Sequence, residues 1–137
     1  MRLVVDSNVV FAAIVARGVT SDLLFHKDLR LLAPEFLNEE YGAYRAYLSK
    51  KAGLNVETID AVKNRFFTRI RVFAKPDYES CRTEAERITP DPNDAPFFAL
   101  ALKENAGIWS NDKALKRQNR VPVYSTHDLV ARLFPTG

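Results

Sequence analysis

The sequence is poor in cysteine and has no long hydrophobic run, and each absence excludes a class of protein. A single cysteine, Cys81, in 137 residues excludes a disulfide framework and a cysteine-based zinc site. The longest uncharged apolar stretch, residues 7–16, is far too short to cross a bilayer, so no membrane partner is expected. An acid at position 6 comes too early for a secretory signal peptide. We therefore expect a cytoplasmic protein.

Glycine and proline are also scarce, with five and seven residues, which excludes a fibrous or linker-dominated chain. The composition that remains, 47% hydrophobic and 27% charged, is that of an ordinary globular domain. A chain of 137 residues has room for one hydrophobic core, so residues 1–137 are expected to form a single domain. The net charge of +3 permits a polyanionic partner without requiring one.

Short apolar runs alternate with amphipathic stretches, which predicts an α/β domain with a mostly parallel sheet. Strands are expected near residues 3–5, 31–33, 72–73, 108–110 and 121–124. Helices are expected near residues 7–16, 21–27, 35–52, 58–70, 79–88, 94–105, 113–118 and 125–134. Residues 89–93 contain two prolines and are predicted to form a loop.

Two features of the predicted helices are specific enough to compare with a structure. Gly53 and Gly107 follow the helices expected at 35–52 and 94–105, and each is expected to end its helix. In the 35–52 helix, Tyr41 and Tyr44 repeat at helical spacing with two leucines, which predicts that both rings lie in the core or in an interface. Tyr47 lies off this stripe and is a candidate for an exposed ring that stacks on a base.

Acidic residues stand where predicted strands end and predicted helices begin. Asp6 and Asp112 follow the first and fourth strands, and Asp94 opens a helix that is apolar nearly all round. In an open parallel sheet the carboxyl ends of the strands share one edge, and ligand sites form there. Glu40 borders the apolar face of the long helix, whereas Glu39 points further toward solvent.

Each of these acids also has an ordinary structural explanation. Asp6, Asp94 and Asp112 can cap the helices that they precede, and Glu39 or Glu40 can be a solvated charge on a helix. The joint pattern favours chemistry, because several carboxylates directed into one pocket repel one another unless a cation neutralises them. Oxygen ligands select Mg²⁺ or Mn²⁺. A water held between such a cation and a carboxylate base can attack a phosphodiester in line.

Four segments of the sequence resemble the signature of the PIN domain family. They are residues 4–9 (VVDSNV), 33–41 (APEFLNEEY), 91–102 (DPNDAPFFALAL) and 108–115 (IWSNDKAL). They occur in the family's order and span nearly the whole chain. PIN domains are metal-dependent nucleases, many of them endoribonucleases, and some are the toxins of VapBC toxin–antitoxin pairs.

The resemblance implies a three-layer α/β/α fold with a central parallel sheet of about five strands. It implies that four acids form a catalytic cluster that binds Mg²⁺ or Mn²⁺: Asp6, Glu40, Asp94 and Asp112. It also implies residues that orient these acids or their waters: Ser7, Asn8 and Ser110, with Asn111 beside them. Glu39 is the alternative to Glu40 as the ligand from the helix, and Asp91 adjoins the third acid and can assist it.

Basic residues follow the last acid closely and are candidates for binding the phosphates of a nucleic acid: Lys113, Lys116 and Arg117. The leading hypothesis is therefore a metal-dependent endoribonuclease. If the chain is a toxin, a cognate antitoxin is a further partner, and the tyrosine-rich helix is a candidate surface for a homodimer.

Two other classes of function are alternatives to a nuclease. The first is a PIN-like module that binds RNA or protein without cutting it. The second is phosphoryl transfer through an aspartate, which is disfavoured because the related phosphatases need a second Asp two residues after the first, where this chain has Asn8.

Overall fold

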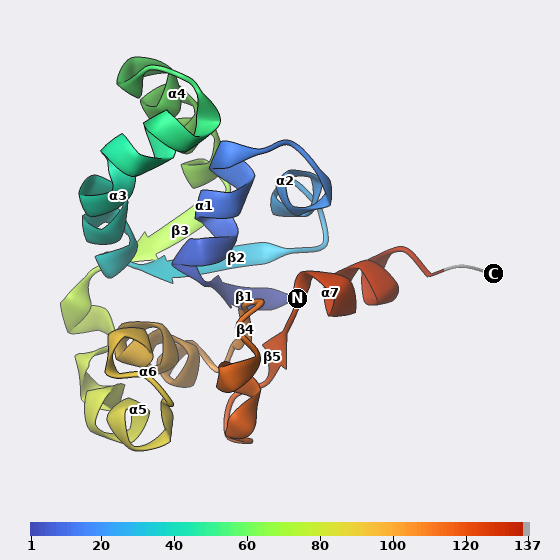
Figure 1. Ribbon diagram of the computed structural model, residues 1–137. Coiled ribbons are helices and arrows are strands. Elements are labelled where there is room, and N and C mark those ends of the chain that lie inside the picture. Colours follow the sequence, from blue (N-terminus) through green and yellow to red (C-terminus); the bar gives the residue numbers. More distant parts are fainter. Residues whose placement is uncertain (136–137) are drawn as a thin grey trace.

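The computed structural model describes residues 1–135 and has a five-stranded sheet between layers of helices (Figure 1). The strands are β1 (Arg2–Val5), β2 (Arg30–Pro34), β3 (Ile70–Phe73), β4 (Gly107–Trp109) and β5 (Val123–Tyr124). Every pairing in this sheet is parallel, and the order across it is β3-β2-β1-β4-β5. The predicted α/β fold with about five parallel strands is confirmed.

Helices cover both faces of the sheet (Figure 1). One face carries α1 (Ser7–Val15), α2 (Val19–Leu24), α3 (Phe36–Ala52) and α4 (Val56–Phe67), and the other carries α5 (Arg82–Ile88) and α6 (Ala95–Glu104). The last helix, α7 (Thr126–Leu133), follows β5. Short 3₁₀ turns occupy Lys75–Asp77, Glu79–Cys81, Pro92–Asp94 and Lys113–Arg117.

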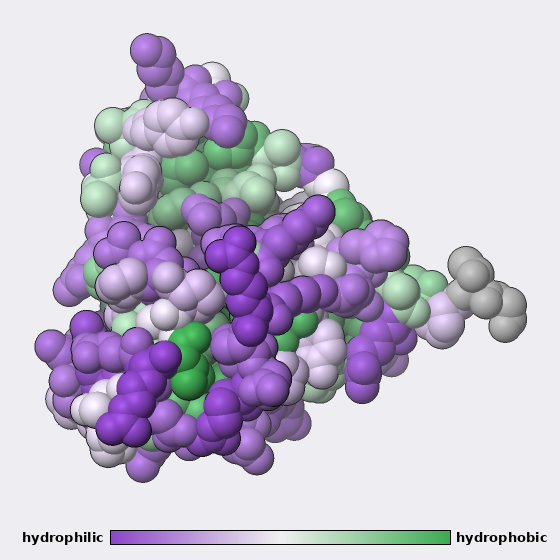
Figure 2. Space-filling view, turned by 60° about the horizontal axis from the view of Figure 1, so that its bottom comes forward, coloured by the Kyte–Doolittle hydropathy of each residue, from purple (hydrophilic) through white to green (hydrophobic). Residues whose placement is uncertain are grey.

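The surface is mostly hydrophilic on the face shown in Figure 2, where apolar and weakly polar residues gather in the upper part. Across residues 1–135, no helix combines the length and the hydropathy that a bilayer span requires.

Side chains that alternate along β1 and β2 contribute to a hydrophobic core on each side of the sheet. Leu3 and Val5 pack into the cluster formed with α1 and α3, whereas Val4 packs against α6. Successive side chains of a strand point to opposite faces, which produces this division. β2 repeats it, with Leu31 on the first side and Leu32 on the second. Both faces of these strands are buried, as is usual for a parallel sheet.

The ends of the helices agree with the prediction at Gly53 and differ at α6. Gly53 has a φ of 71° and ends α3 in the left-handed conformation. α6 ends at Asn105, with a φ of 51°, and Gly107 instead begins β4. Asparagine tolerates the left-handed region because its short side chain bonds locally. α4 stops at Phe67, earlier than predicted, because Ile70 begins β3.

Two of the three tyrosines of α3 lie as predicted. Tyr41 is buried and Tyr47 is 57% exposed, as expected, whereas Tyr44 is 50% exposed and not part of the core. The Tyr41 hydroxyl donates to Oδ1 of Asp60 on α4 over 2.6 Å, and the Arg45 guanidinium donates to both oxygens of the same carboxylate. These bonds hold α3 to α4. Leu48, one turn beyond Tyr44, is buried again, whereas Tyr44 itself lies at the surface.

Gly107 lies where a side chain has no room. A Cβ atom there would come within 3.0 Å of the Tyr124 ring and within 3.2 Å of both Leu3 and the Pro122 carbonyl oxygen. We expect Gly107→Ala to lower the free energy of unfolding by about 1–3 kcal/mol through overpacking, as measured by urea denaturation. Gly42, an exposed position in α3 with nothing within 4 Å of an added Cβ, is the matched control. Gly42→Ala should stabilise by about 0.5–1 kcal/mol, and a Gly107→Ala effect of the same sign would contradict the close approach.

Candidate active site

Residues 1–135 bury three polar or charged side chains, and all three belong to the predicted site: Asp6, Ser7 and Ser110. Asp6 follows β1 and Ser110 follows β4, and these strands are neighbours in the sheet. The Asp6 N–H donates to the Trp109 carbonyl oxygen over 2.9 Å, so the ladder continues to the acid. The sheet itself therefore positions Asp6 and Ser110 side by side.

Ser110 links two of the acids. Its Oγ donates to Oδ2 of Asp6 over 2.7 Å and accepts a hydrogen bond from the backbone N–H of Asp112 over 3.1 Å. Burial raises the pKa of Asp6, the Ser110 bond opposes this rise, and the negative charge of Asp112 adds to it. The two acids are thus near enough for their charges to interact.

α3 brings a third carboxylate to the end of β1. Oγ of Ser7 donates to Oε1 of Glu40 over 2.5 Å. Burial is the main cause that raises the pKa of Glu40, and the charge of Asp6 raises it further. Glu39 is exposed and instead lines a separate pocket with Glu35. The structure therefore places Glu40, and not Glu39, beside Asp6.

Asp94 is half-buried at the start of α6, and its carboxylate accepts no hydrogen bond from residues 1–135. The helix-cap explanation is therefore wrong for this residue. Burial raises the pKa of Asp94 to about 7, with smaller contributions from four other negative charges: Asp6, Asp91, Asp112 and Glu40. The other three acids of the predicted cluster, together with Asp91, therefore act electrostatically on the Asp94 carboxyl group.

Helix capping does account for one hydrogen bond of each of three other acids: Asp112, Asp91 and Asp6. Oδ1 of Asp112 accepts from the Ala114 N–H over 3.0 Å, and Oδ1 of Asp91 accepts from the Asn93 N–H over 3.0 Å. The cap bond of Asp6 is longer, at 3.4 Å. A cap engages one oxygen of a carboxylate, so the second oxygen of Asp112 stays available to a ligand.

The carboxylates suit a hard cation but do not form a closed cage. In the described part of the chain, no three His, Cys, Asp or Glu side chains stand close enough to hold one metal ion together. Asp6 and Asp112 instead line an open pocket of about 310 Å³. Mg²⁺ commonly takes one or two carboxylates and fills its remaining positions with water and substrate phosphate. The raised pKa values at this point mean that a positive charge would be favourable there.

The two predicted asparagines have different surroundings. Asn8 is exposed and lines the pocket. Asn111 also lines it, but its Nδ2 donates to Thr126 Oγ1 over 3.1 Å and its Oδ1 accepts from the Thr126 N–H over 2.7 Å. Asn111 therefore anchors the start of α7 while it lines the pocket, and its role as a support for the acids stays a prediction.

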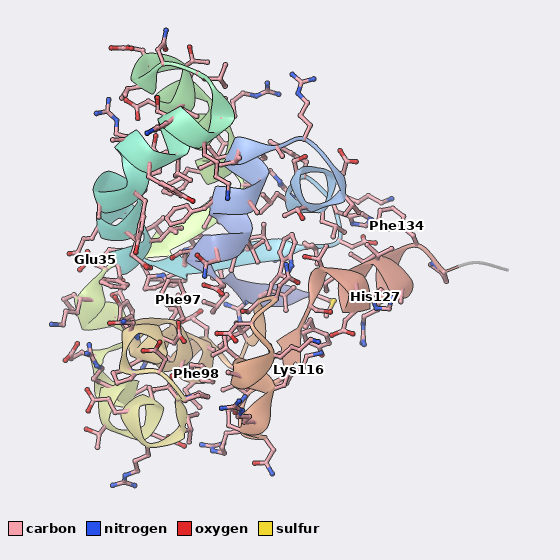
Figure 3. All side chains as sticks on the ribbon, in the orientation of Figure 1. Glu35, Phe97, Phe98, Lys116, His127 and Phe134 are labelled. Atoms are coloured by element: carbon pink, nitrogen blue, oxygen red, sulfur yellow. The ribbon has the colours of Figure 1, made fainter. Side chains whose placement is uncertain are left out.

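The predicted phosphate-binding residues follow the pocket in a 3₁₀ turn, and all three are exposed: Lys113, Lys116 and Arg117. Lys116, labelled in Figure 3, is paired with Asp128 of α7 over 2.6 Å. Lys113 and Arg117 form no ion pair within residues 1–135. The last two are therefore the better candidates for phosphate contacts.

Removing the Ser7 hydroxyl should raise the pKa of Glu40 further. The bond from Ser7 favours the ionised carboxylate, and Ser7→Ala leaves burial and the charge of Asp6 unopposed. Carboxyl-detected NMR titration of Ser7→Ala measures this change. Ser49→Ala is the control, because the Ser49 hydroxyl bonds the Leu54 carbonyl at the far end of α3. An unchanged pKa in Ser7→Ala would show that this hydroxyl does not hold the carboxylate.

Comparisons with known proteins identify the family and agree with the fold. A chain in the crystal structure of VapBC2 from Rickettsia felis, bound to a promoter DNA fragment, is similar with a TM-score of 0.69 and 19% identity, covering 91% of this chain and 98% of that chain. PAE2754 from Pyrobaculum aerophilum has a TM-score of 0.72 and 13% identity, covering 99% and 91%. A search of curated proteins found no significant match. The family model described as "PIN domain" matches residues 4–126, and the chain therefore belongs to the PIN domain family.

Proposed function

We propose that this PIN domain is a metal-dependent endoribonuclease that hydrolyses phosphodiester bonds in RNA. The observation that carries the proposal is that Ser110 links Asp6 to Asp112 and Ser7 holds Glu40 at the end of β1, with the half-buried Asp94, whose pKa is raised to about 7, near enough to interact with their charges. Perturbed carboxylates of this kind concentrate at functional sites. Membership of a family whose members are typically metal-dependent nucleases points to the same chemistry.

The acids have distinct roles in this proposal. Asp6 and Asp112 line the pocket and are its first candidates for oxygen ligands, and Ser110 orients both. Asp94 supplies a carboxylate that no donor of residues 1–135 neutralises. Glu40, oriented by Ser7, adds a further negative charge beside the proposed metal-binding pocket. A bound Mg²⁺ or Mn²⁺ would polarise a phosphate oxygen and lower the pKa of a bound water.

The test is the cleavage of end-labelled structured and unstructured RNA by the purified protein with Mn²⁺, Mg²⁺ or EDTA. We expect cutting with at least one of the metals, no cutting in EDTA, and recovery when excess metal is added back. This pattern follows because the carboxylates alone repel phosphate and supply no electrophile. Cutting at full rate in EDTA would contradict the proposal.

We further propose that the protein acts as the toxin of a toxin–antitoxin pair. Its structural similarity to a chain of VapBC2 supports this role. An apolar groove of about 910 Å³ between α1, α2 and α4, lined in part by Ile14, Phe25 and Phe66, offers a surface for the antitoxin. The Phe25 side chain is 44% exposed in this groove, and exposed apolar side chains of this kind mark surfaces that a partner protein covers.

A PIN-like module that binds RNA without cutting it is the second candidate. The observation that favours it is the open spacing of the acids, since no three metal-ligating side chains of residues 1–135 converge on one point. A metal titration separates the two candidates. A binding module keeps its affinity for RNA in EDTA and cuts with neither metal.

A further inference from the structure

A groove with exposed tyrosines runs between α1 and α3 and has a volume of about 510 Å³. Its walls include residues of both helices: Asn8, Phe11 and Ala12 from α1, and Tyr44, Tyr47 and Lys51 from α3. We call it the tyrosine groove. From the sequence, Tyr44 was expected in the core or in an interface, and Tyr47 was the candidate for stacking on a base.

The tyrosine groove adjoins the candidate active site at one residue. Asn8 lines both this groove and the pocket that contains Asp6 and Asp112. The two concave surfaces therefore meet, and a flexible polymer bound at the carboxylates can pass directly into the groove.

α3 carries one line of side chains from the acids into the groove. Glu40, Tyr44, Tyr47 and Lys51 follow one another at helical spacing and so share one face of the helix. With a rise of about 1.5 Å per residue, Tyr44 lies about 6 Å and Tyr47 about 10 Å along the axis from Glu40. The rings are thus within the reach of nucleotides that flank a phosphate held at the acids.

Both rings are supported by a neighbour and remain largely open to solvent. Tyr44 is 50% exposed and contacts Phe11, with ring centroids 5.8 Å apart. Tyr47 is 57% exposed, and Nζ of Lys51 lies 5.8 Å from its ring centroid. Aromatic rings placed in this way along a groove are platforms on which successive bases stack.

The charge of the tyrosine groove favours an anionic occupant, such as a nucleic acid, over a cationic or purely apolar one. Among the described residues that line it, Lys51 is charged and none is acidic. Lys50, the preceding residue, is also exposed at this end of α3. A duplex conceals the faces of its bases, whereas an unpaired strand exposes them to such rings.

We propose that the tyrosine groove binds an unpaired RNA segment next to the cleaved bond, with bases on Tyr44 and Tyr47 and a phosphate at Lys51. This assignment rests on the proposed nuclease function for the position of the cleaved bond, but the binding itself does not require cleavage.

The test measures binding in EDTA, where no metal-dependent cleavage occurs. Fluorescence anisotropy compares a labelled single-stranded oligoribonucleotide with a fully paired duplex of the same sequence. We expect Tyr44→Ala and Tyr47→Ala each to weaken single-strand binding by about 5- to 100-fold, whereas Tyr44→Phe and Tyr47→Phe retain it. Phe134→Ala is the control, because Phe134 is 49% exposed and lies at the end of α7, away from α3 (Figure 3).

Two results would overturn the proposal. One is single-strand binding that is equal in wild type and in both alanine variants. The other is sedimentation that shows wild type as a dimer and both alanine variants as monomers, since a second copy would then cover the groove.

Failure of the nuclease proposal looks different from failure of the groove proposal. If the protein cuts RNA with neither Mg²⁺ nor Mn²⁺, but the alanine variants lose single-strand binding, the groove proposal holds and the nuclease proposal fails. A protein that cuts with metal, with an unchanged KM in the alanine variants, has the activity without the groove. If both proposals hold, the alanine variants raise KM and change kcat little, because the rings contact bases and not the reacting phosphate.

Discussion

Replacing Asp6 with asparagine should lower the rate of RNA cleavage by more than about a hundredfold while the fold stays intact. Removing even an outer partner of a metal ligand typically costs about 10- to 100-fold in metal affinity or activity, and Asp6 is a proposed ligand itself. Its position supports this role, since it lines the pocket and its charge raises the pKa of both Glu40 and Asp94. Single-turnover cleavage of labelled RNA with Mn²⁺ measures the effect.

The fold should tolerate this change, because asparagine caps a helix about as well as aspartate and has nearly the same size. The variant also removes a negative charge that repels other acids, so its melting temperature in EDTA should not fall. Asp28→Asn, at an exposed turn before β2, is the matched control and should cut like wild type. Equal cutting by wild type and Asp6→Asn would contradict the carboxylate mechanism.

For the toxin role, induced expression of the wild-type protein should arrest the growth of a bacterial host, and expression of Asp6→Asn should not.

The stability of the metal-free protein should fall as the pH rises from about 4 to about 7, and Asp94→Asn should remove much of this fall. The pKa of Asp94 is about 7 in the folded protein, against an ordinary value of 3.8. Between these values the folded state keeps a proton that the unfolded chain has released, so its stability decreases with pH and levels off above the higher value. Asp94 is half-buried and screened by solvent, so we expect a change of about 1–2 kcal/mol.

Neighbouring groups do not reverse this sign. The pKa values of Asp6 and Glu40 are also raised by burial, so they add to the fall in the same direction. The pKa values of Asp60 and Asp128 are lowered to about 2 by their bonds to Arg45 and Lys116, and stability from these acids is lost only at lower pH.

Urea denaturation in EDTA near about pH 5 and about pH 8 measures the slope. Asp91→Asn is the matched control, because Asp91 is an exposed cap close to Asp94 in sequence and should leave most of the slope in place. Mn²⁺ at the higher pH should raise the melting temperature of wild type more than that of Asp94→Asn. Stability that is level across this pH range would contradict the pKa assigned to Asp94.

The positions of the acids at the ends of strands and the starts of helices could be predicted from the sequence, but their hydrogen-bond partners could not. Strand ends and helix starts follow from local patterns, so the places of Asp6, Asp94 and Asp112 along the elements could be anticipated. Whether an acid caps its helix depends on the geometry of one turn. Asp112 bonds the N–H two residues on, whereas Asp94 bonds none within residues 1–135, and both look alike in sequence.

Side-chain environments set by distant elements could not be predicted. The ion pair of Lys116 with Asp128 depends on where α7 packs. The exposure of Tyr44 depends on how far α1 and α4 extend over α3, which the helical spacing of its apolar residues does not report. The left-handed cap of α6 could not be predicted at Asn105, because glycine takes this conformation more often than asparagine and Gly107 follows two residues later.

The bond between Ser110 and Asp6 joins residues 104 positions apart, and this separation governs when the site comes into existence. Chains fold from the N-terminus as they leave the ribosome, and β1, β2 and β3 are neighbours in the sheet, so they can pair early. β4 joins β1 only after nearly all of the domain has been synthesised. A nascent chain therefore carries Asp6 without its serine partner or Asp112. The acidic cluster on which the proposed nuclease function depends is therefore incomplete while most of the chain is still being translated.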